Sequence, residues 1–178
     1  LVGSGELSSL VPERTWLETE KVFKADNLNE YFITLINLNA FNQIYPDLKL
    51  LIIGDGPEKH TLEKLTAFLE LSRNVSFLGN IPNSSVGPIF SRSLASISAS
   101  KSEAFGIVNI ESLREGTPVI CTNTEGAKDI IVNGENGFIV DLTKKNDLVR
   151  KIELVLKNWE KYSKNALKTF DKRYAKHN

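Results

Sequence analysis

The sequence predicts an α/β domain of the Rossmann-like type, a doubly wound parallel sheet with helices on both faces. Short, unbroken apolar runs alternate along the chain with segments of helical periodicity. Unbroken apolar runs are typical of parallel strands that are buried on both faces, and the intervening helices are typical of crossover connections. Glycine-rich turns follow several of these runs, and the carboxyl ends of such strands are where doubly wound sheets bind ligands.

The elements follow in a regular order from residue 48 onward. We predict strands at residues 48–53, 75–78, 94–99, 117–121 and 137–140. Helical spacing of apolar residues predicts helices at 58–71, 83–92, 106–115, 126–132 and 144–157, with a charged tail helix at about 158–175.

The first part of the chain gives weaker signals. Residues 31–44 are apolar-rich and predict a helix, and Leu1-Val2 is interpreted as the end of a truncated first strand. Residues 5–27 are polar and are predicted to be irregular. The chain begins with Leu1 and contains no methionine, so we expect it to be one piece, residues 1–178, of a longer protein.

Composition excludes several classes of function. Basic and acidic residues number 22 each, so the net charge gives no argument for a nucleic-acid partner or an anionic membrane surface. The single cysteine, Cys121, cannot form an internal disulfide, which favours a reducing compartment such as the cytoplasm. No cluster of cysteine and histidine has the spacing of metal ligands, and no apolar run is long enough to span a bilayer.

Two glutamates flank a glycine turn between the predicted strand 94–99 and the following helix. Glu103 precedes Gly106, and Glu111 lies in the helix. The N–H groups at a helix N-terminus suit phosphate, and glycine permits close approach of a ligand to the backbone. Carboxylates instead accept hydrogen bonds from sugar or ribose hydroxyls. The alternative is that Glu103 caps the helix and Glu111 is an exposed surface residue.

The segment E-A-F-G-I-V-N-I-E, residues 103–111, resembles the E-x7-E motif of retaining glycosyltransferases of the GT-B class, in the group 1 family. The segments LKLLIIGDGP, VSFLGNIP, EGTPVICTNTEGAKDII and NGENGFIVD also match that family in order, so the resemblance covers about residues 30–157. It implies that this chain is the C-terminal, donor-binding half of a GT-B fold, with the N-terminal acceptor domain absent from this sequence.

The resemblance also implies roles for individual residues. Glu103 is the implied catalytic residue, which binds hydroxyls of the donor sugar, and Glu111 holds the ribose. The family's arginine after the first strand is missing here, so Lys24 is the implied partner of the diphosphate, with Lys21 and Arg14 as alternatives. The remaining implied donor-binding residues are Ala104, Phe105, Gly106 and Ile107 at the sugar and diphosphate, Asn80 and Ile81 at the base, and Gly54 and Gly56 on the cleft floor.

The implied reaction is transfer of a hexose from an NDP-sugar, UDP- or GDP-hexose, to a glycan or lipid-linked acceptor with retention of anomeric configuration. No metal or other cofactor is required in that chemistry, and the fragment alone is expected to be inactive. A nucleotide-sugar epimerase of similar architecture and a non-catalytic glycosyltransferase-like subunit are the alternatives. The full-length protein is expected in the cytoplasm, with peripheral membrane contact through its other domain. The charged tail, residues 157–176, leaves open contact with that domain, contact with the membrane, or a solvated helical face.

Overall fold

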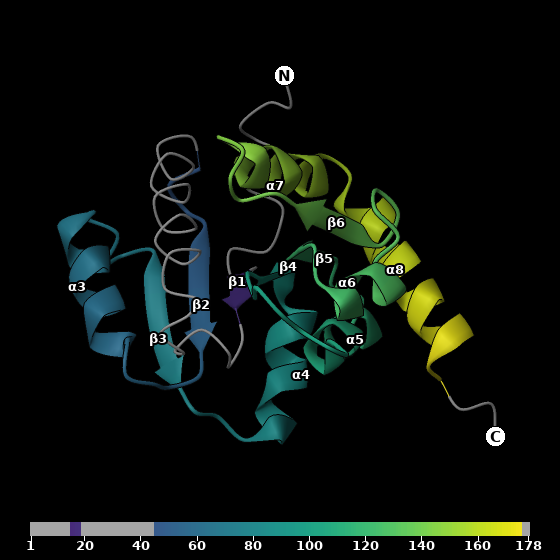
Figure 1. Ribbon diagram of the computed structural model, residues 1–178, viewed down its shortest axis with the longest axis horizontal. Helices are drawn as coiled ribbons and strands as arrows, with labels where there is room; N and C mark the ends of the chain where they lie inside the picture. Colours follow the sequence, from purple (N-terminus) through teal and green to yellow (C-terminus); the bar gives the residue numbers. More distant parts are fainter. Residues whose placement is uncertain (1–14, 19–44, 176–178) are drawn as a thin grey trace.

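The computed structural model describes residues 15–18 and 45–175, which form one six-stranded parallel sheet in the order β3-β2-β1-β4-β5-β6 (Figure 1). Helices cover both faces of this sheet, as predicted. The strands are β1 (Thr15–Glu18), β2 (Lys49–Ile53), β3 (Val75–Gly79), β4 (Ser93–Ser98), β5 (Val119–Thr122) and β6 (Gly137–Val140).

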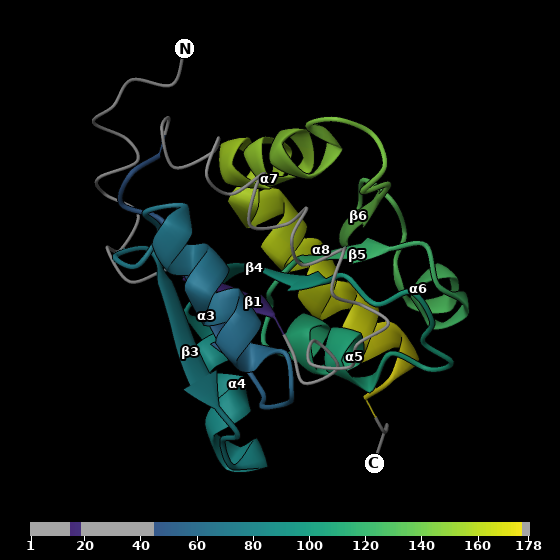
Figure 2. The same ribbon diagram turned by 60° about the vertical axis from the view of Figure 1, so that its left-hand side comes forward.

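Two groups of helices pack on opposite faces of the sheet. One core contains residues of α3 and α7. Figure 2 shows α3 in front of β3, with α7 at the top of the view. The opposite face is covered by α4, α5, α6 and the later part of α8, which form two further apolar clusters. Tyr162, near the start of α8, packs in the first core. The helices are α3 (Lys59–Phe68), α4 (Asn83–Ser91), α5 (Ile107–Arg114), α6 (Glu125–Ile130), α7 (Asp147–Lys157) and α8 (Trp159–Arg173).

Burial on both faces explains the unbroken apolar runs. In β2, Leu50 and Ile52 join the core beneath α3 and α7, whereas Leu51 and Ile53 belong to the cluster under α4. Consecutive residues of a strand point to opposite faces, so each face of β2 needs its own apolar residues. The five strands predicted after residue 48 are all confirmed, with shifts of one or two residues at their ends.

The first strand is a correction to the sequence analysis. The backbone of β1 pairs with β2 on one side and with β4 on the other, in the middle of the sheet. The prediction that residues 5–27 are irregular is therefore wrong for Thr15–Glu18. The segment T-W-L-E is short and ends in a charged residue, so it lacks the apolar run expected of a central strand. The predicted strand at Leu1-Val2 and helix at 31–44 lie outside the described residues.

Helix boundaries follow local hydrogen bonds. Helix α6 begins after Thr124, whose hydroxyl accepts a hydrogen bond from the N–H of Ala127 at 3.2 Å, a typical N-cap. The predicted tail helix is confirmed as α8. None of the helices in the described part of the chain is long and apolar enough to cross a membrane.

A buried hydroxyl anchors α5 to the sheet. The side chain of Ser112 lies 2.8 Å from the hydroxyl of Ser96 in β4 and donates to the carbonyl of Thr117, just before β5, at 2.9 Å. All three residues are buried. Because buried polar groups need partners, these bonds hold the α5 backbone at a defined height above the sheet.

Replacing Ser112 by alanine is expected to destabilise the fold by about 1–3 kcal/mol, because it leaves the Ser96 hydroxyl and the Thr117 carbonyl buried with one partner fewer. The matched control is Ser91→Ala, whose exposed hydroxyl donates to the Pro88 carbonyl at 3.0 Å and whose loss should change stability by less than about 0.5 kcal/mol. Urea unfolding of both variants measures the difference, and equal stabilities would contradict the anchoring role of Ser112.

Candidate functional site

Loops from several strands meet at one edge of the sheet. Because all six strands are parallel, the carboxyl ends of β2, β3, β4 and β5 lie at the same edge. The predicted site residues that the structure describes all come from the loops and the helix that follow three of these strands, β2, β3 and β4.

The loops after β2 and β3 are joined directly. The N–H of Gly54 donates to the carbonyl of Gly79 at 2.8 Å, and Gly54 has a φ of 120°, a conformation that favours glycine. The N–H of Gly56 is bonded to the carboxylate of Asp55 at 2.9 Å. The structure therefore brings Gly54 and Gly56 beside the turn that leads to Asn80.

Asn80 and Ile81 have different surroundings. The side chain of Asn80 is exposed at this edge. Ile81 is half-buried and packs in the cluster that contains Ile53 and Phe90. Lys59, which the sequence analysis did not single out, pairs with Asp55 at 3.5 Å and brings a positive charge close to Gly79.

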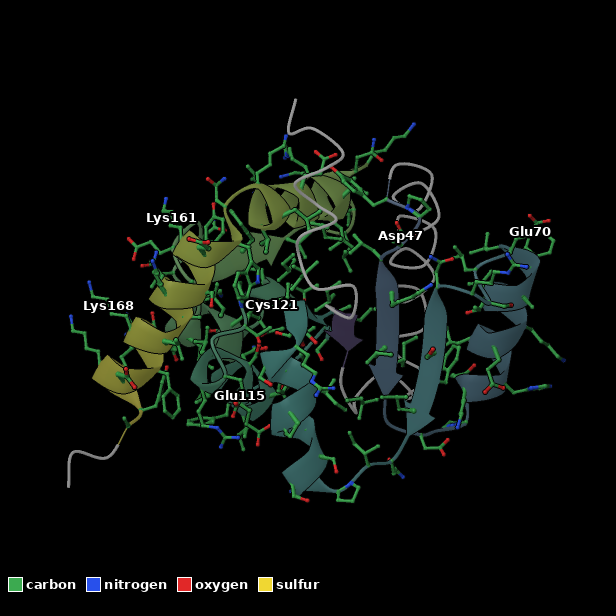
Figure 3. The ribbon with its side chains drawn as sticks, turned by 180° about the vertical axis from the view of Figure 1, so that it is seen from behind. Asp47, Glu70, Glu115, Cys121, Lys161 and Lys168 are labelled. Atoms are coloured by element: carbon green, nitrogen blue, oxygen red, sulfur yellow. The ribbon has the colours of Figure 1, made fainter. Side chains whose placement is uncertain are left out.

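Glu103 is buried, with 8% of its surface exposed, in the loop between β4 and α5. Its backbone carbonyl accepts a hydrogen bond from the N–H of Gly126 in α6 at 2.9 Å. Burial, and to a lesser extent the negative charge of Glu103, raises the pKa of the Cys121 thiol in β5 to about 12. The Glu103 side chain thus belongs to the interior of the edge, and Figure 3 shows Cys121 well inside the molecule.

Gly126 forms a close contact that sequence reasoning missed. A Cβ atom at this position would lie 2.7 Å from the carbonyl carbon of Phe105 and 2.9 Å from its nitrogen. The backbones of α6 and of the loop before α5 therefore touch, and only glycine permits this approach. The available signal was the glycine at the first position of the helix predicted at 126–132, a type of residue that is otherwise unfavourable in a helix.

Gly106 is the residue at which the loop turns into α5. It has a φ of 71°, and a Cβ atom there would lie 3.0 Å from Nδ2 of Asn109 and 3.1 Å from Cδ1 of Ile130. Asn109 is buried, and its Nδ2 has no hydrogen-bond partner among the described residues. The side chains of Asn109 and Ile130 thus pack against one side of the turn, and a ligand would approach the turn from the other side.

The outer side of the turn is open. Ala104 is exposed, and the apolar side chains of Phe105 and Ile107 are 66% and 60% exposed. Glu111 is half-buried and lies one helical turn after Ile107, on the same face of α5. Large exposed apolar side chains beside a carboxylate indicate a surface that another molecule or domain covers.

The arrangement suits a ligand with both phosphate and hydroxyl groups. The first N–H groups of α5 have no partners within the helix and carry a partial positive charge, which favours an anion. Glu103 and Glu111, on either side of this N-terminus, can accept hydrogen bonds from hydroxyls. In residues 45–175 and β1, no group of three or more metal-ligating side chains is found. Lys24, Lys21 and Arg14 lie outside the described residues.

Sequence comparison assigns the family. The model of the family described as "Glycosyl transferases group 1" matches residues 29–169. The chain belongs to the group 1 glycosyltransferase family. A curated relative of this family, the alpha-monoglucosyldiacylglycerol synthase of Acholeplasma laidlawii, is 31% identical over 139 residues, 76% of this chain and 34% of the relative. The first five curated group 1 relatives are covered over 25% to 34% of their length, so this chain spans about a third of such proteins.

Solved structures of glycosyltransferases share the fold. The C-terminal domain of LpcC, a group 1 protein of Francisella tularensis, superimposes with a TM-score of 0.74 at 21% identity and covers 96% of this chain and 91% of that domain. HepE of Anabaena, solved in complex with UDP-glucose, gives a TM-score of 0.77 at 19% identity over 97% of this chain and 50% of HepE. The GT-B neighbours agree with the predicted fold class.

The Gly126 contact can be tested by comparing two glycines inside helices. Gly126→Ala is expected to destabilise the protein by about 1–3 kcal/mol, because the new methyl group displaces the Phe105 backbone. In Gly87→Ala the nearest atom outside the adjacent residues, Oε1 of Glu115 at 3.2 Å, ends a flexible side chain. The gain in helix propensity of about 1 kcal/mol is opposed by the contact of the new methyl group with the ring of Pro88, so the net change should be within about 1 kcal/mol. Denaturant unfolding measures both, and a Gly126→Ala protein as stable as Gly87→Ala would refute the contact.

Proposed function

We propose that this chain is the donor-binding domain of a retaining glycosyltransferase that moves a hexose from an NDP-sugar to a glycan or lipid-linked acceptor. The observation that carries the proposal is the pair of carboxylates, Glu103 and Glu111, on either side of the glycine turn that begins α5. Sugar hydroxyls, ribose hydroxyls and a diphosphate are the groups that such a combination recognises.

Each part of the donor has a matching group. The N–H groups at the start of α5, around Gly106 and Ile107, bind the diphosphate and stabilise the negative charge that develops as it leaves. Glu103, the proposed catalytic residue, binds hydroxyls of the hexose, and Glu111 binds the ribose. Asn80 and Ile81 face the base through backbone groups. The backbone of Glu103 is held by the hydrogen bond from Gly126, so the loop that carries its carboxylate needs little reorganisation when the sugar binds.

The diphosphate also requires a cation. Lys59, at the edge near Gly79, is engaged with Asp55 in the described part of the chain. We therefore assign charge neutralisation to Lys24, or to Lys21 or Arg14 in its place. No metal is needed in this proposal, because helix N–H groups and a lysine or arginine supply the positive charge.

The sugar nucleotide bound by a solved neighbour and the glycosidic linkage named for a relative support this proposal. HepE, whose fold this chain shares, was solved with UDP-glucose. The LpcC domain, which aligns with this chain over nearly the full length of both, is the C-terminal domain of its protein. The name of the Acholeplasma relative specifies an alpha-linked glucosyl lipid, which corresponds to retention when the donor sugar is itself α-linked. For the whole protein, we propose in addition a second domain that binds the acceptor.

Calorimetric titration with UDP, GDP, ADP and their hexose conjugates tests the site. The chain is expected to bind one diphosphate, and Glu111→Ala should weaken that binding about 10- to 100-fold, because hydrogen bonds from the ribose to a charged group are lost. Glu103→Ala should instead remove the preference for the sugar nucleotide over the bare nucleotide. The control is Glu63→Ala, an exposed glutamate on α3 whose carboxylate lies 3.8 Å from Nδ1 of His60.

Equal affinities in the unaltered chain, Glu111→Ala and Glu103→Ala would overturn the site assignment. Product analysis with the full-length protein separates the alternatives. Conversion of the donor without any acceptor would indicate an epimerase, and donor binding without transfer would indicate a non-catalytic subunit. An inverted product would refute retention.

A further inference from the structure

A row of four lysines covers the outer side of α8. Their spacing of three, four and four residues places them on one face of the helix, and all are exposed. We call this surface the lysine face: Lys161, Lys164, Lys168 and Lys172. It extends over about 16 Å of the helix, at a rise of about 1.5 Å per residue. Figure 3 shows Lys161 and Lys168 projecting outward from α8, away from the sheet.

The opposite side of α8 is fixed to the domain. Tyr162 and Ala166 are buried. A Cβ atom on Gly116, just after α5, would lie 3.2 Å from both Ser163 and Leu167, so α8 lies tightly against the end of α5. The lysine face is therefore held in a fixed direction on a rigid support, on the side of α8 that faces away from α5.

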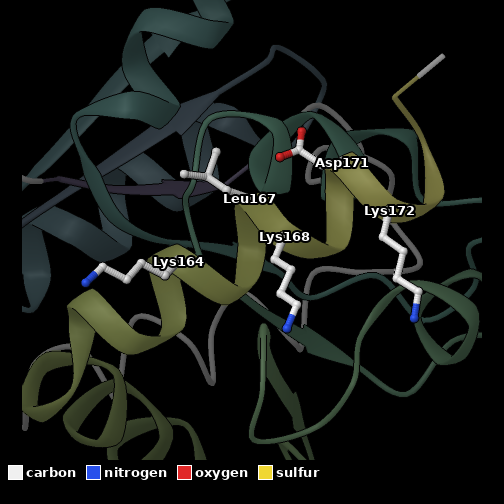
Figure 4. A pocket seen from close by; sticks show the side chains of 5 residues that line it. All are labelled: Lys164, Leu167, Lys168, Asp171 and Lys172. Atoms are coloured by element: carbon white, nitrogen blue, oxygen red, sulfur yellow. The ribbon is translucent and has the colours of Figure 1, made fainter. Parts of the chain in front are cut away.

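The charges of the lysine face are not neutralised by neighbours. Within the described ranges, no carboxylate forms an ion pair with any of the four lysines, whereas Lys59, Lys128 and Lys144 are each paired. Glu160 and Asp171 lie along one edge of the exposed surface, and Figure 4 shows Asp171 and Leu167 pointing to the other side of the helix from Lys168 and Lys172. The chain is neutral overall, whereas α8 carries five basic residues and two acidic ones.

We propose that the lysine face docks this domain on an anionic phospholipid bilayer. Lysines next to a negatively charged leaflet are each attracted to it, and their long side chains adapt to mobile headgroups. Leu167, which is 41% exposed, lies at the edge of the row next to Lys164 and packs partly against Gly116, so the attraction to a bilayer comes from the lysines. The proposal does not depend on the donor site, which lies at the carboxyl edge of the sheet.

The surface fits a bilayer better than a macromolecule. A shallow, open depression of about 560 Å³ runs along it, lined by Lys164, Leu167, Lys168, Asp171 and Lys172 (Figure 4). Lysine is depleted at protein interfaces, and Leu167 is the one large apolar side chain of α8 that is exposed in the described part of the chain. Nucleic-acid surfaces combine basic residues with aromatic side chains on which bases stack, whereas Tyr162 next to Lys161 is buried.

Co-sedimentation with vesicles of phosphatidylcholine, with and without phosphatidylglycerol, tests the proposal. The unaltered chain is expected to bind only the anionic vesicles, and binding should fall at high salt. Lys168→Gln should weaken partitioning about fivefold, and the same change at all four lysines on the order of several hundredfold. The matched control changes four exposed lysines elsewhere to glutamine, Lys64, Lys128, Lys144 and Lys145, and should keep most of the affinity at the same net charge.

Three results would overturn the proposal. One is no binding of the unaltered chain to anionic vesicles at low salt. Another is an equal loss of binding in the control variant, which would show that net charge rather than the lysine face matters. The third is binding to a single-stranded oligonucleotide as tight as to vesicles, lost in the same lysine variants. Circular dichroism and thermal unfolding confirm that each variant is folded. The single substitution Lys168→Gln tests vesicle binding with the smallest change to the protein.

Discussion

The contact between Gly126 and the backbone of Phe105 is the constraint on which the candidate site depends. It holds the loop after β4 against α6, and the adjacent hydrogen bond from the Gly126 N–H to the Glu103 carbonyl sets the direction of the loop. A long loop with two exposed apolar side chains would otherwise sample many conformations at a high entropic cost. Held in this way, the loop presents a buried carboxylate and an open helix N-terminus at the same time.

Helix α5 is constrained at both of its ends. At its start, Gly106 turns with a positive φ over the side chains of Asn109 and Ile130. At its end, Ser112 bonds to β4 and to the chain before β5, and Gly116 lets α8 approach closely. A rigid helix keeps its N-terminal N–H groups aimed at one place, and preorganised donors are what stabilise charge as it develops.

Periodicity predicted most of the fold because parallel strands buried on both faces and amphipathic helices have distinct patterns. It failed at Thr15–Glu18, where a central strand is only four residues long and is identified by its pairing with β2 and β4. The glutamates and Gly106 were predicted from the motif. The burial of Glu103 and the role of Gly126 were not, because both depend on the approach of α6 to the loop, a tertiary contact that no local pattern encodes.

Packing between α5 and α8 links the two surfaces that this chain presents. The proposed donor site lies at the start of α5, and the lysine face lies on the side of α8 that points away from α5. The side chains of Ser163 and Leu167 in α8 pack directly on Gly116, just after the end of α5, so the two helices are in tight contact. A bilayer bound at the lysine face would therefore hold the carboxyl edge of the sheet at a fixed orientation to the membrane. An acceptor carried by a lipid would then meet the donor in a restricted geometry, which lowers the entropic cost of bringing the two together.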